Sequence, residues 1–97
     1  MIRLRFHPEA QIELLGSAKG YEAEQPGLGK RFLEAVRDAT CKIRLSPSMF
    51  QCVEGKARRC CVERFPFGLV FREENDEIQI LAVIHFKRDP DYWKKRL

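Results

Sequence analysis

Residues 57–97 read ARRCCVERFPFGLVFREENDEIQILAVIHFKRDPDYWKKRL, and this stretch decides the fold. Its alternating and apolar runs predict three strands, over residues 57–64, 67–72 and 77–85. The corner Phe65-Pro66-Phe67 and the acidic turn at residues 73–76 separate them, and connections this short join antiparallel neighbours. Residues 80–84 are almost entirely apolar, so the last strand is expected to be central and covered on much of both faces.

The residues before this stretch predict one further strand and two helices. Residues 2–6 alternate apolar and arginine side chains, which indicates a strand with one wet face. A helix is expected from about Pro8 to Glu24, with Ile12 and Leu15 flanking its buried stripe. A cleaner amphipathic helix begins at Leu28 and ends at Ser46-Pro47.

The connections complete the predicted architecture. The short link at Pro26-Gly27 implies an antiparallel helical hairpin. Residues 46–56 are expected to form a loop, held to the body of the domain by Met49 and Phe50. The order is therefore β-α-α-β-β-β, an α+β fold in a single domain over residues 1–97. The hairpin covers one face of a mainly antiparallel sheet, and the other, arginine-rich face is expected to be open.

Composition narrows the class of protein. The chain has 97 residues, of which 44% are hydrophobic and 33% charged, as expected of a globular domain. No apolar run approaches the roughly 20 residues of a membrane helix, and the N-terminus does not resemble a secretory signal, so a cytoplasmic location is expected. The net charge of +4 favours an acidic partner, either nucleic acid or an acidic protein segment.

The four cysteines do not suggest a cofactor. Cys41, Cys52, Cys60 and Cys61 form no C-x-x-C pair, and the adjacent pair points to opposite faces of a strand. We interpret them as reduced thiols, in preference to a metal site or a disulfide. Because the sequence also lacks a glycine-rich phosphate loop and a Ser-His-Asp arrangement, no metal and no cofactor are expected.

Arginines of the strand at residues 57–64 are the first candidates for a binding surface. Arg58 and Arg64 are expected on one face of this strand and Arg59 on the other. They form either a cationic surface for phosphates and carboxylates or solvated edge charge that limits aggregation of the sheet. The sequence leaves both interpretations open.

The end of the chain carries the other candidates. His85 is either a general acid or base or a hydrogen-bonded structural histidine. Arg88, Tyr92 and Trp93 follow, with a turn fixed by Asp89-Pro90. These side chains suit base stacking or anchoring of a protein partner. In the alternative interpretation, Trp93 folds back on the core and residues 94–96 form a solvated tail.

The chain resembles the RelE/ParE superfamily of type II toxins, and most closely its ParE branch, often labelled plasmid stabilisation proteins. The resemblance spans nearly the whole chain. It is carried by four segments: the FHPEA start at residues 6–10, the PGLG turn at 26–29, the RFPF corner at 64–67, and the H-x-x-R-x-P-x-Y-W ending at 85–93. It implies a toxin neutralised by a cognate antitoxin, whose acidic, partly disordered segment wraps the toxin in a hetero-oligomer.

Two activities occur in this superfamily. RelE-like members cut mRNA on the ribosome, and ParE-like members are associated with inhibition of DNA gyrase. The nucleases carry an arginine where this chain has Gly68, and a glycine cannot stabilise a pentavalent phosphorane. The resemblance therefore favours a non-enzymatic gyrase inhibitor. A metal-independent ribonuclease using Arg59, His85, Arg88 and Tyr92 is the alternative, and a degenerate toxin that only binds its antitoxin and represses its operon is the third possibility.

The arginine-bearing strand and the end of the chain suit such a partner. The residues expected to contact the antitoxin or the cellular target are Arg58, Arg59, Arg64, Arg88, Tyr92 and Trp93. No metal ligand is expected among them.

Overall fold

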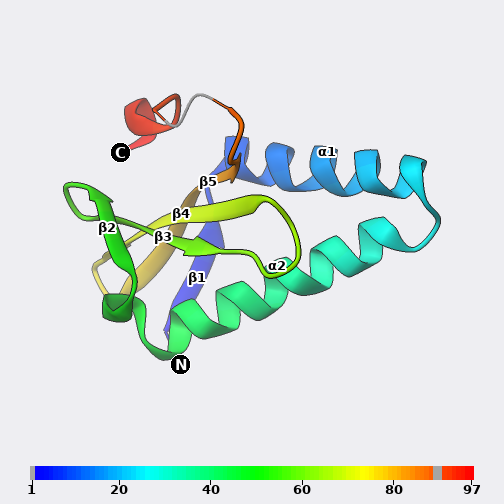
Figure 1. The fold of residues 1–97 in the computed structure, drawn as a ribbon. Coiled ribbons are helices and arrows are strands. Elements are labelled where there is room, and N and C mark those ends of the chain that lie inside the picture. The colour runs from blue at the N-terminus through cyan, green and yellow to red at the C-terminus, as the bar shows by residue number, and fades with distance from the viewer. Residues whose placement is uncertain (1, 89–90) are drawn as a thin grey trace.

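The computed structural model describes residues 2–88 and 91–97 and shows two helices packed on a five-stranded sheet (Figure 1). The turn expected at Asp89-Pro90 lies outside the described residues. The elements in chain order are β1 (Arg3–Phe6), α1 (Pro8–Glu24), α2 (Leu28–Leu45), the 3-10 turn η1 (Pro47–Met49), β2 (Gln51–Glu54), β3 (Ala57–Cys61), β4 (Phe67–Glu74), β5 (Glu77–His85) and the 3-10 turn η2 (Lys94–Arg96).

The sheet has the order β1-β5-β4-β3-β2, with β1 parallel to β5 and every other pair antiparallel. The predicted α+β class, the helical hairpin and the antiparallel neighbours are confirmed. β5 lies between β1 and β4, and residues 80–84 are buried, as their apolar run predicted.

The predicted loop at residues 46–56 is wrong in part, because Gln51–Glu54 forms the edge strand β2. A tight turn at Gly55, which has φ of 52°, folds β2 back onto β3. Most of β2 is exposed, so pairing with β3, not an apolar pattern, stabilises it. Of the two residues expected to hold this segment, Phe50 packs on Phe71 with ring centroids 5.8 Å apart, whereas Met49 is exposed.

The buried face of α1 is narrower than predicted. Ala10, Leu14 and Ala18 are buried, but Ile12 is 70% exposed and Leu15 is 53% exposed. The spacing of four residues between the buried side chains defines one stripe, and Ile12 lies about two residues, or roughly 200°, away from Ala10 around the helix. α1 therefore presents two apolar side chains to solvent.

The hairpin needs a glycine at position 29, where α2 approaches the backbone of α1. A Cβ on Gly29 would lie 2.5 Å from the Ala18 carbonyl oxygen of α1. The Glu22 carboxylate accepts hydrogen bonds from the Gly27 and Gly29 amides, at 2.9 and 3.0 Å, and so caps the start of α2. The PGLG segment thus fixes the distance between the helices.

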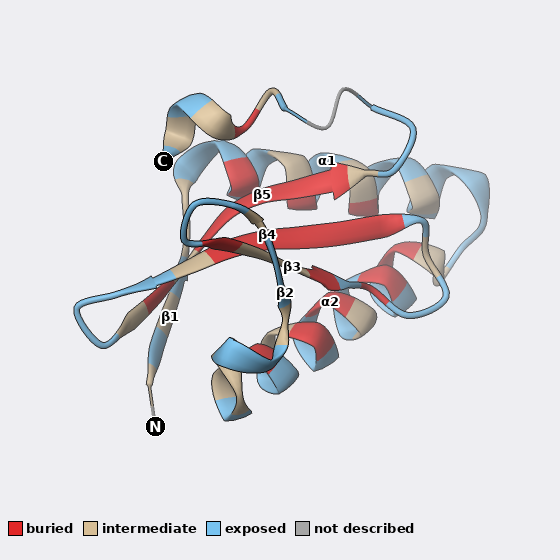
Figure 2. Cartoon of the chain, turned by 60° about the vertical axis from the view of Figure 1, so that its left-hand side comes forward, coloured by how far each residue is buried: buried red, intermediate tan, exposed pale blue. Residues whose placement is uncertain are grey.

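The sheet has a hydrophobic cluster on each face. The larger cluster lies between the helices and the sheet and includes Phe32, Leu69 and Ile80. The smaller cluster lies on the opposite face and consists of Ala57, Val70, Leu81, Ala82, Ile84 and Trp93. Figure 2 shows β4 and β5 buried along most of their length. The expectation of an open second face is wrong, because the C-terminal segment at residues 91–97 folds back over it.

Within the described residues, neither helix is long and apolar enough to cross a membrane.

Candidate partner-binding surface

Arg58 and Arg59 lie on opposite faces of the sheet. Val70, the cross-strand partner of Arg59, belongs to the smaller cluster, whereas Phe71, the partner of Arg58, belongs to the larger one. The Arg58 guanidinium donates to the Phe50 carbonyl at 2.6 Å and to the Ser48 carbonyl at 3.3 Å. Arg58 therefore stabilises the segment that leads into β2. Any contact of Arg58 with a partner would come in addition to this role.

The Arg59 side chain lies across Gly68. A Cβ on Gly68 would lie 3.2 Å from both Cγ and Cδ of Arg59 and 3.2 Å from the Phe86 ring. The Arg59 guanidinium lies 5.8 Å from the centroid of that ring. Gly68 thus provides the space that brings Arg59 and Phe86 together, which is a structural reason for a glycine at this position.

Arg64 is not on a strand. β3 ends at Cys61, and Arg64 lies in the turn that follows with φ of 69°. The prediction that Arg58 and Arg64 share a strand face is therefore wrong. Arg64 instead lines a groove of about 560 Å³ beside α2, together with Arg31, Lys42 and Glu63. Both cations and carboxylates line this groove.

His85 ends β5 on the helix side of the sheet. Its cross-strand partner is Phe67, and the two rings meet edge to face with centroids 4.9 Å apart. His85 Nδ1 accepts a hydrogen bond from the Lys87 amide at 3.1 Å, so the imidazole also stabilises the turn after β5. A groove of about 390 Å³ runs past His85 and Arg88 and is bordered by the exposed Ile12 of α1.

The four residues of the alternative nuclease are not gathered at one place. Arg59 lies on the second face of the sheet, whereas His85 lies on the helix side. The Tyr92 hydroxyl donates to the Val83 carbonyl at 3.5 Å, near the Glu13 carboxylate, whose charge acts on it. Only His85 and Arg88 line the same groove.

Trp93 is 3% exposed and belongs to the smaller cluster, as the fold-back interpretation predicted. Its indole N–H has no acceptor among the described residues. The other half of that interpretation, a solvated tail at residues 94–96, is wrong for Arg96. The side chain of Arg96 is only 8% exposed.

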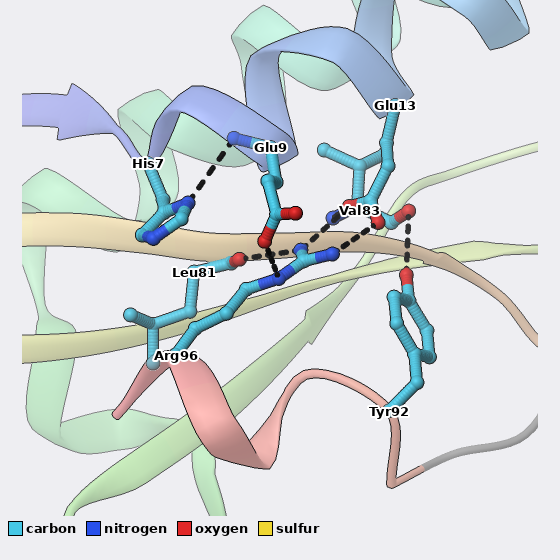
Figure 3. Close-up of polar contacts among 7 residues, drawn as sticks. All are labelled: His7, Glu9, Glu13, Leu81, Val83, Tyr92 and Arg96. Carbon is cyan, nitrogen blue, oxygen red and sulfur yellow. Dashed lines mark hydrogen bonds and ion pairs between the residues drawn. The ribbon is translucent and has the colours of Figure 1, made fainter.

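Arg96 and Glu13 close the free edge of β5 (Figure 3). β1 pairs with β5 only as far as Ile80, which leaves the next residues of β5 without a strand on that side. The Glu13 carboxylate accepts from the Val83 amide at 3.0 Å, and the Arg96 guanidinium donates to the Leu81 carbonyl at 3.0 Å. These two side chains thus satisfy backbone groups of β5 that a neighbouring strand would otherwise hydrogen-bond.

Burial, together with the Glu13 carboxylate, raises the pKa of Tyr92 to about 12. Burial of the phenol is the largest cause, and the charge and hydrogen bond of Glu13 add to it. The Arg96 guanidinium lies 5.1 Å from the centroid of the Tyr92 ring. Glu13, Tyr92 and Arg96 therefore hold the C-terminal segment against α1 and β5.

Sequence reasoning missed Glu13 and the role of Arg96. One signal was present, because Glu13 lies three residues after Ala10 and four before Ser17, on the buried side of α1. A carboxylate at such a position needs a cation and hydrogen-bond donors. Nothing in the sequence indicates that a residue 83 positions away supplies them.

Among the described residues, no group of three His, Cys, Asp or Glu side chains is placed to hold a metal ion. Cys41, Cys52 and Cys61 are exposed free thiols, and Cys60 is a buried one.

No family model matches the chain, and no curated protein matches it. A solved structure described as a chromosomal ParDE TA (toxin–antitoxin) system from P. aeruginosa does match it in fold. The TM-score is 0.68 at 22% sequence identity, and the match covers 90% of this chain and 98% of that one. The chain therefore has the fold that its resemblance to the RelE/ParE superfamily implied.

Proposed function

We propose that this chain is the toxin of a type II toxin–antitoxin system and that it acts as ParE-like toxins do, by inhibiting DNA gyrase. The observation that carries the proposal is the fold shared over 90% of the chain with a chain of a ParDE TA system. The FHPEA, PGLG, RFPF and C-terminal segments of the sequence support the same assignment. Because DNA gyrase is in the cytoplasm, the proposal places this chain there as well.

The placement of the basic residues supports an inhibitor over a nuclease. Acid–base cleavage of RNA needs its proton donor, its acceptor and the groups that stabilise the phosphorane around one phosphate. Here the sheet lies between Arg59 and His85, and Gly68 supplies no side chain. The ribonuclease alternative rests on His85 and Arg88, which line one groove.

The proposed partner is a cognate antitoxin with an acidic segment, and the two form a hetero-complex. Its proposed contacts are Arg58, Arg59, Arg64, Arg88, Tyr92 and Trp93. Arg59, Arg64 and Arg88 are the most available of these, since Arg58 and Tyr92 are hydrogen-bonded within the chain and Trp93 is buried. Ile12, which lines the same groove as Arg88, adds exposed apolar surface there.

Controlled expression of the chain alone in a bacterial host tests the proposal. Pulse labelling follows DNA and protein synthesis, and a supercoiling assay with purified gyrase follows the target directly. We expect DNA synthesis to stop first, cells to filament and supercoiling to be inhibited. Co-expression of the protein encoded next to the toxin gene is expected to restore growth.

Three variants sharpen this experiment. Arg59→Gln removes a cation from the second face of the sheet, and Arg88→Gln removes one from the groove beside His85. Arg3→Gln, which removes an exposed cation of β1, is the matched control. Cleavage of ribosome-bound mRNA that Arg88→Ala or His85→Ala abolishes would replace the gyrase proposal with the ribonuclease. Harmless expression of a folded chain would indicate a degenerate toxin that only binds its antitoxin.

A further inference from the structure

A small pocket lies on the second face of the sheet, between the strands and the C-terminal segment. Its volume is about 140 Å³, and it is lined by apolar side chains and by Arg59, Asp91, Trp93 and Lys94. Its base is the smaller hydrophobic cluster, so the polar groups around it are in a partly desolvated setting, where hydrogen bonds to charged groups are strengthened.

Two donors at this pocket have no acceptor within the described part of the chain. No hydrogen bond or ion pair joins the Arg59 guanidinium to a described residue, although the side chain is half-buried and lies against Gly68 and Phe86. The indole N–H of Trp93 is enclosed and unpaired. An enclosed donor without an acceptor, such as the Trp93 N–H, costs about 1–3 kcal/mol, and the half-buried Arg59 guanidinium adds an unpaired positive charge, so a ligand that accepts from both is favoured.

The charges at the rim select among acidic ligands. Lys94 is already neutralised, because its ammonium lies 2.9 Å from Glu54 and 3.2 Å from Asp91. Arg59 therefore supplies the available positive charge inside the pocket. The Asp91 carboxylate on the wall and Glu54 beside Lys94 repel anions, and this repulsion grows with the number of negative charges, so a single carboxylate is favoured over the repeated charges of a nucleic-acid backbone.

We propose that this Arg59–Trp93 pocket binds one carboxylate side chain of the antitoxin's acidic segment. The Arg59 guanidinium is the principal ligand, and the Trp93 indole N–H is the second donor. That the carboxylate comes from an antitoxin rests on the function proposed above. The preference of the pocket for a carboxylate does not depend on that function. Gly68 is part of this binding site, because a side chain at position 68 would displace Arg59.

The chain contains one tryptophan, so its indole N–H gives a single signal in a ¹H–¹⁵N correlation spectrum. The experiment titrates the purified chain with acetate, with glutarate and with inorganic phosphate, at constant ionic strength set with chloride. We expect the indole and Gly68 amide signals to move saturably with both carboxylates. Arg59→Gln is expected to weaken this binding about tenfold or more, because charge-assisted hydrogen bonds are lost, and Arg3→Gln to leave it unchanged.

Each other result overturns part of the proposal. No saturable shift, or equal binding by Arg59→Gln, removes the pocket. Tighter binding of phosphate than of carboxylate assigns it to a phosphate ligand instead, and a shift of Gly68 without the indole removes Trp93 as a donor. Arg59→Lys and circular dichroism show whether a loss reflects binding or folding. Because the probes are simple anions, the result is independent of toxicity, and absent toxicity with intact carboxylate binding would refute only the proposed function.

Discussion

Glu13 of α1 and Arg96 of η2 form a two-pronged ion pair across 83 positions of sequence. The Arg96 Nη1 and Nη2 atoms lie 3.1 and 2.9 Å from the two oxygens of the Glu13 carboxylate. The pair is mostly buried, with 14% of the Glu13 side chain and 8% of the Arg96 side chain exposed. It joins the first helix, the edge of β5 and the end of the chain.

Glu13→Ala is expected to destabilise the fold strongly. It leaves the Val83 amide without its acceptor and the Arg96 charge with only the exposed Glu9 as counter-ion. Breaking a fully buried ion pair costs about 3–5 kcal/mol, so about 2–4 kcal/mol is expected here. Urea unfolding followed by circular dichroism measures the change.

Glu9→Ala is the matched control, because Glu9 also pairs with Arg96, at 3.1 Å, but is 59% exposed. A cost under about 1 kcal/mol is expected for it. Equal effects of the two substitutions would show that the pair at Glu13 contributes no more than a surface contact.

The pKa of Tyr92 makes stability depend on pH in the alkaline range. Since the folded-state pKa is about 12 and the ordinary value is 10.0, the stabilisation is complete below pH 10 and is lost as pH rises toward 12. Tyr92→Phe is expected to flatten this part of the curve.

The measurement is the denaturation midpoint at several values of pH between 8 and 12, with absorbance at 295 nm to follow phenolate formation. The chain has two tyrosines, and burial also raises the pKa of Tyr21, so the variant supplies the background curve. An unchanged slope in Tyr92→Phe would rule out the phenol as the cause.

The sequence predicted the parts of the fold whose patterns are local. The apolar run at residues 80–84 identified the central strand, and the PGLG segment identified the hairpin. β2 carries no such pattern, since Gln51–Glu54 is mostly exposed and becomes a strand only by pairing with β3. An edge strand of this kind depends on a neighbour that periodicity cannot reveal.

The candidate site divides in the same way. Strand alternation placed Arg59 opposite Arg58 correctly, and a fold-back of Trp93 was among the sequence interpretations. The pairing of Glu13 with Arg96 could not be predicted, because a charge near the chain end carries no periodic signal. Because this ion pair could not be predicted, the second face of the sheet was expected to be open.

Trp93→Ala is expected to cost about 3–5 kcal/mol, because it removes the largest side chain of the smaller cluster. Trp93→Phe retains one aromatic ring and removes the rest of the indole together with its unpaired N–H, so it leaves a smaller cavity than Trp93→Ala and is expected to cost less. Thermal unfolding of both variants tests this. Comparable losses would mean that a phenyl ring recovers none of the packing of the indole in this cluster.

Gly68→Arg is expected not to create a ribonuclease. The arginine would meet the Arg59 stem and the Phe86 ring at its Cβ, and His85 would still lie on the other side of the sheet. Gly68→Ala is the control for crowding alone, and a cost of about 1 kcal/mol is expected, because its neighbours are flexible side-chain atoms. Primer extension on ribosome-bound mRNA detects cleavage, and cleavage by Gly68→Arg would contradict this prediction.

The four thiols are expected to differ in reactivity but not in importance for function. Cys41, Cys52 and Cys61 are exposed, whereas Cys60 is buried and its pKa is raised by that burial. Because the thiolate is the reactive form, Cys60 is shielded both by its protonation and by its surroundings. Alkylation of the native chain with iodoacetamide, followed by mass spectrometry, is expected to modify three sites, and the fourth only after unfolding.

Replacement of all four cysteines by alanine is expected to leave toxicity intact. The three exposed positions are expected to change stability by less than about 0.5 kcal/mol each. Cys60→Ala removes a buried sulfur beside α2 and is expected to cost about 1 kcal/mol, so the fold is retained. Loss of toxicity in a folded variant would mean that a thiol contacts the cellular target. Restoring Cys61 alone would then test the exposed thiol that borders the α2 groove.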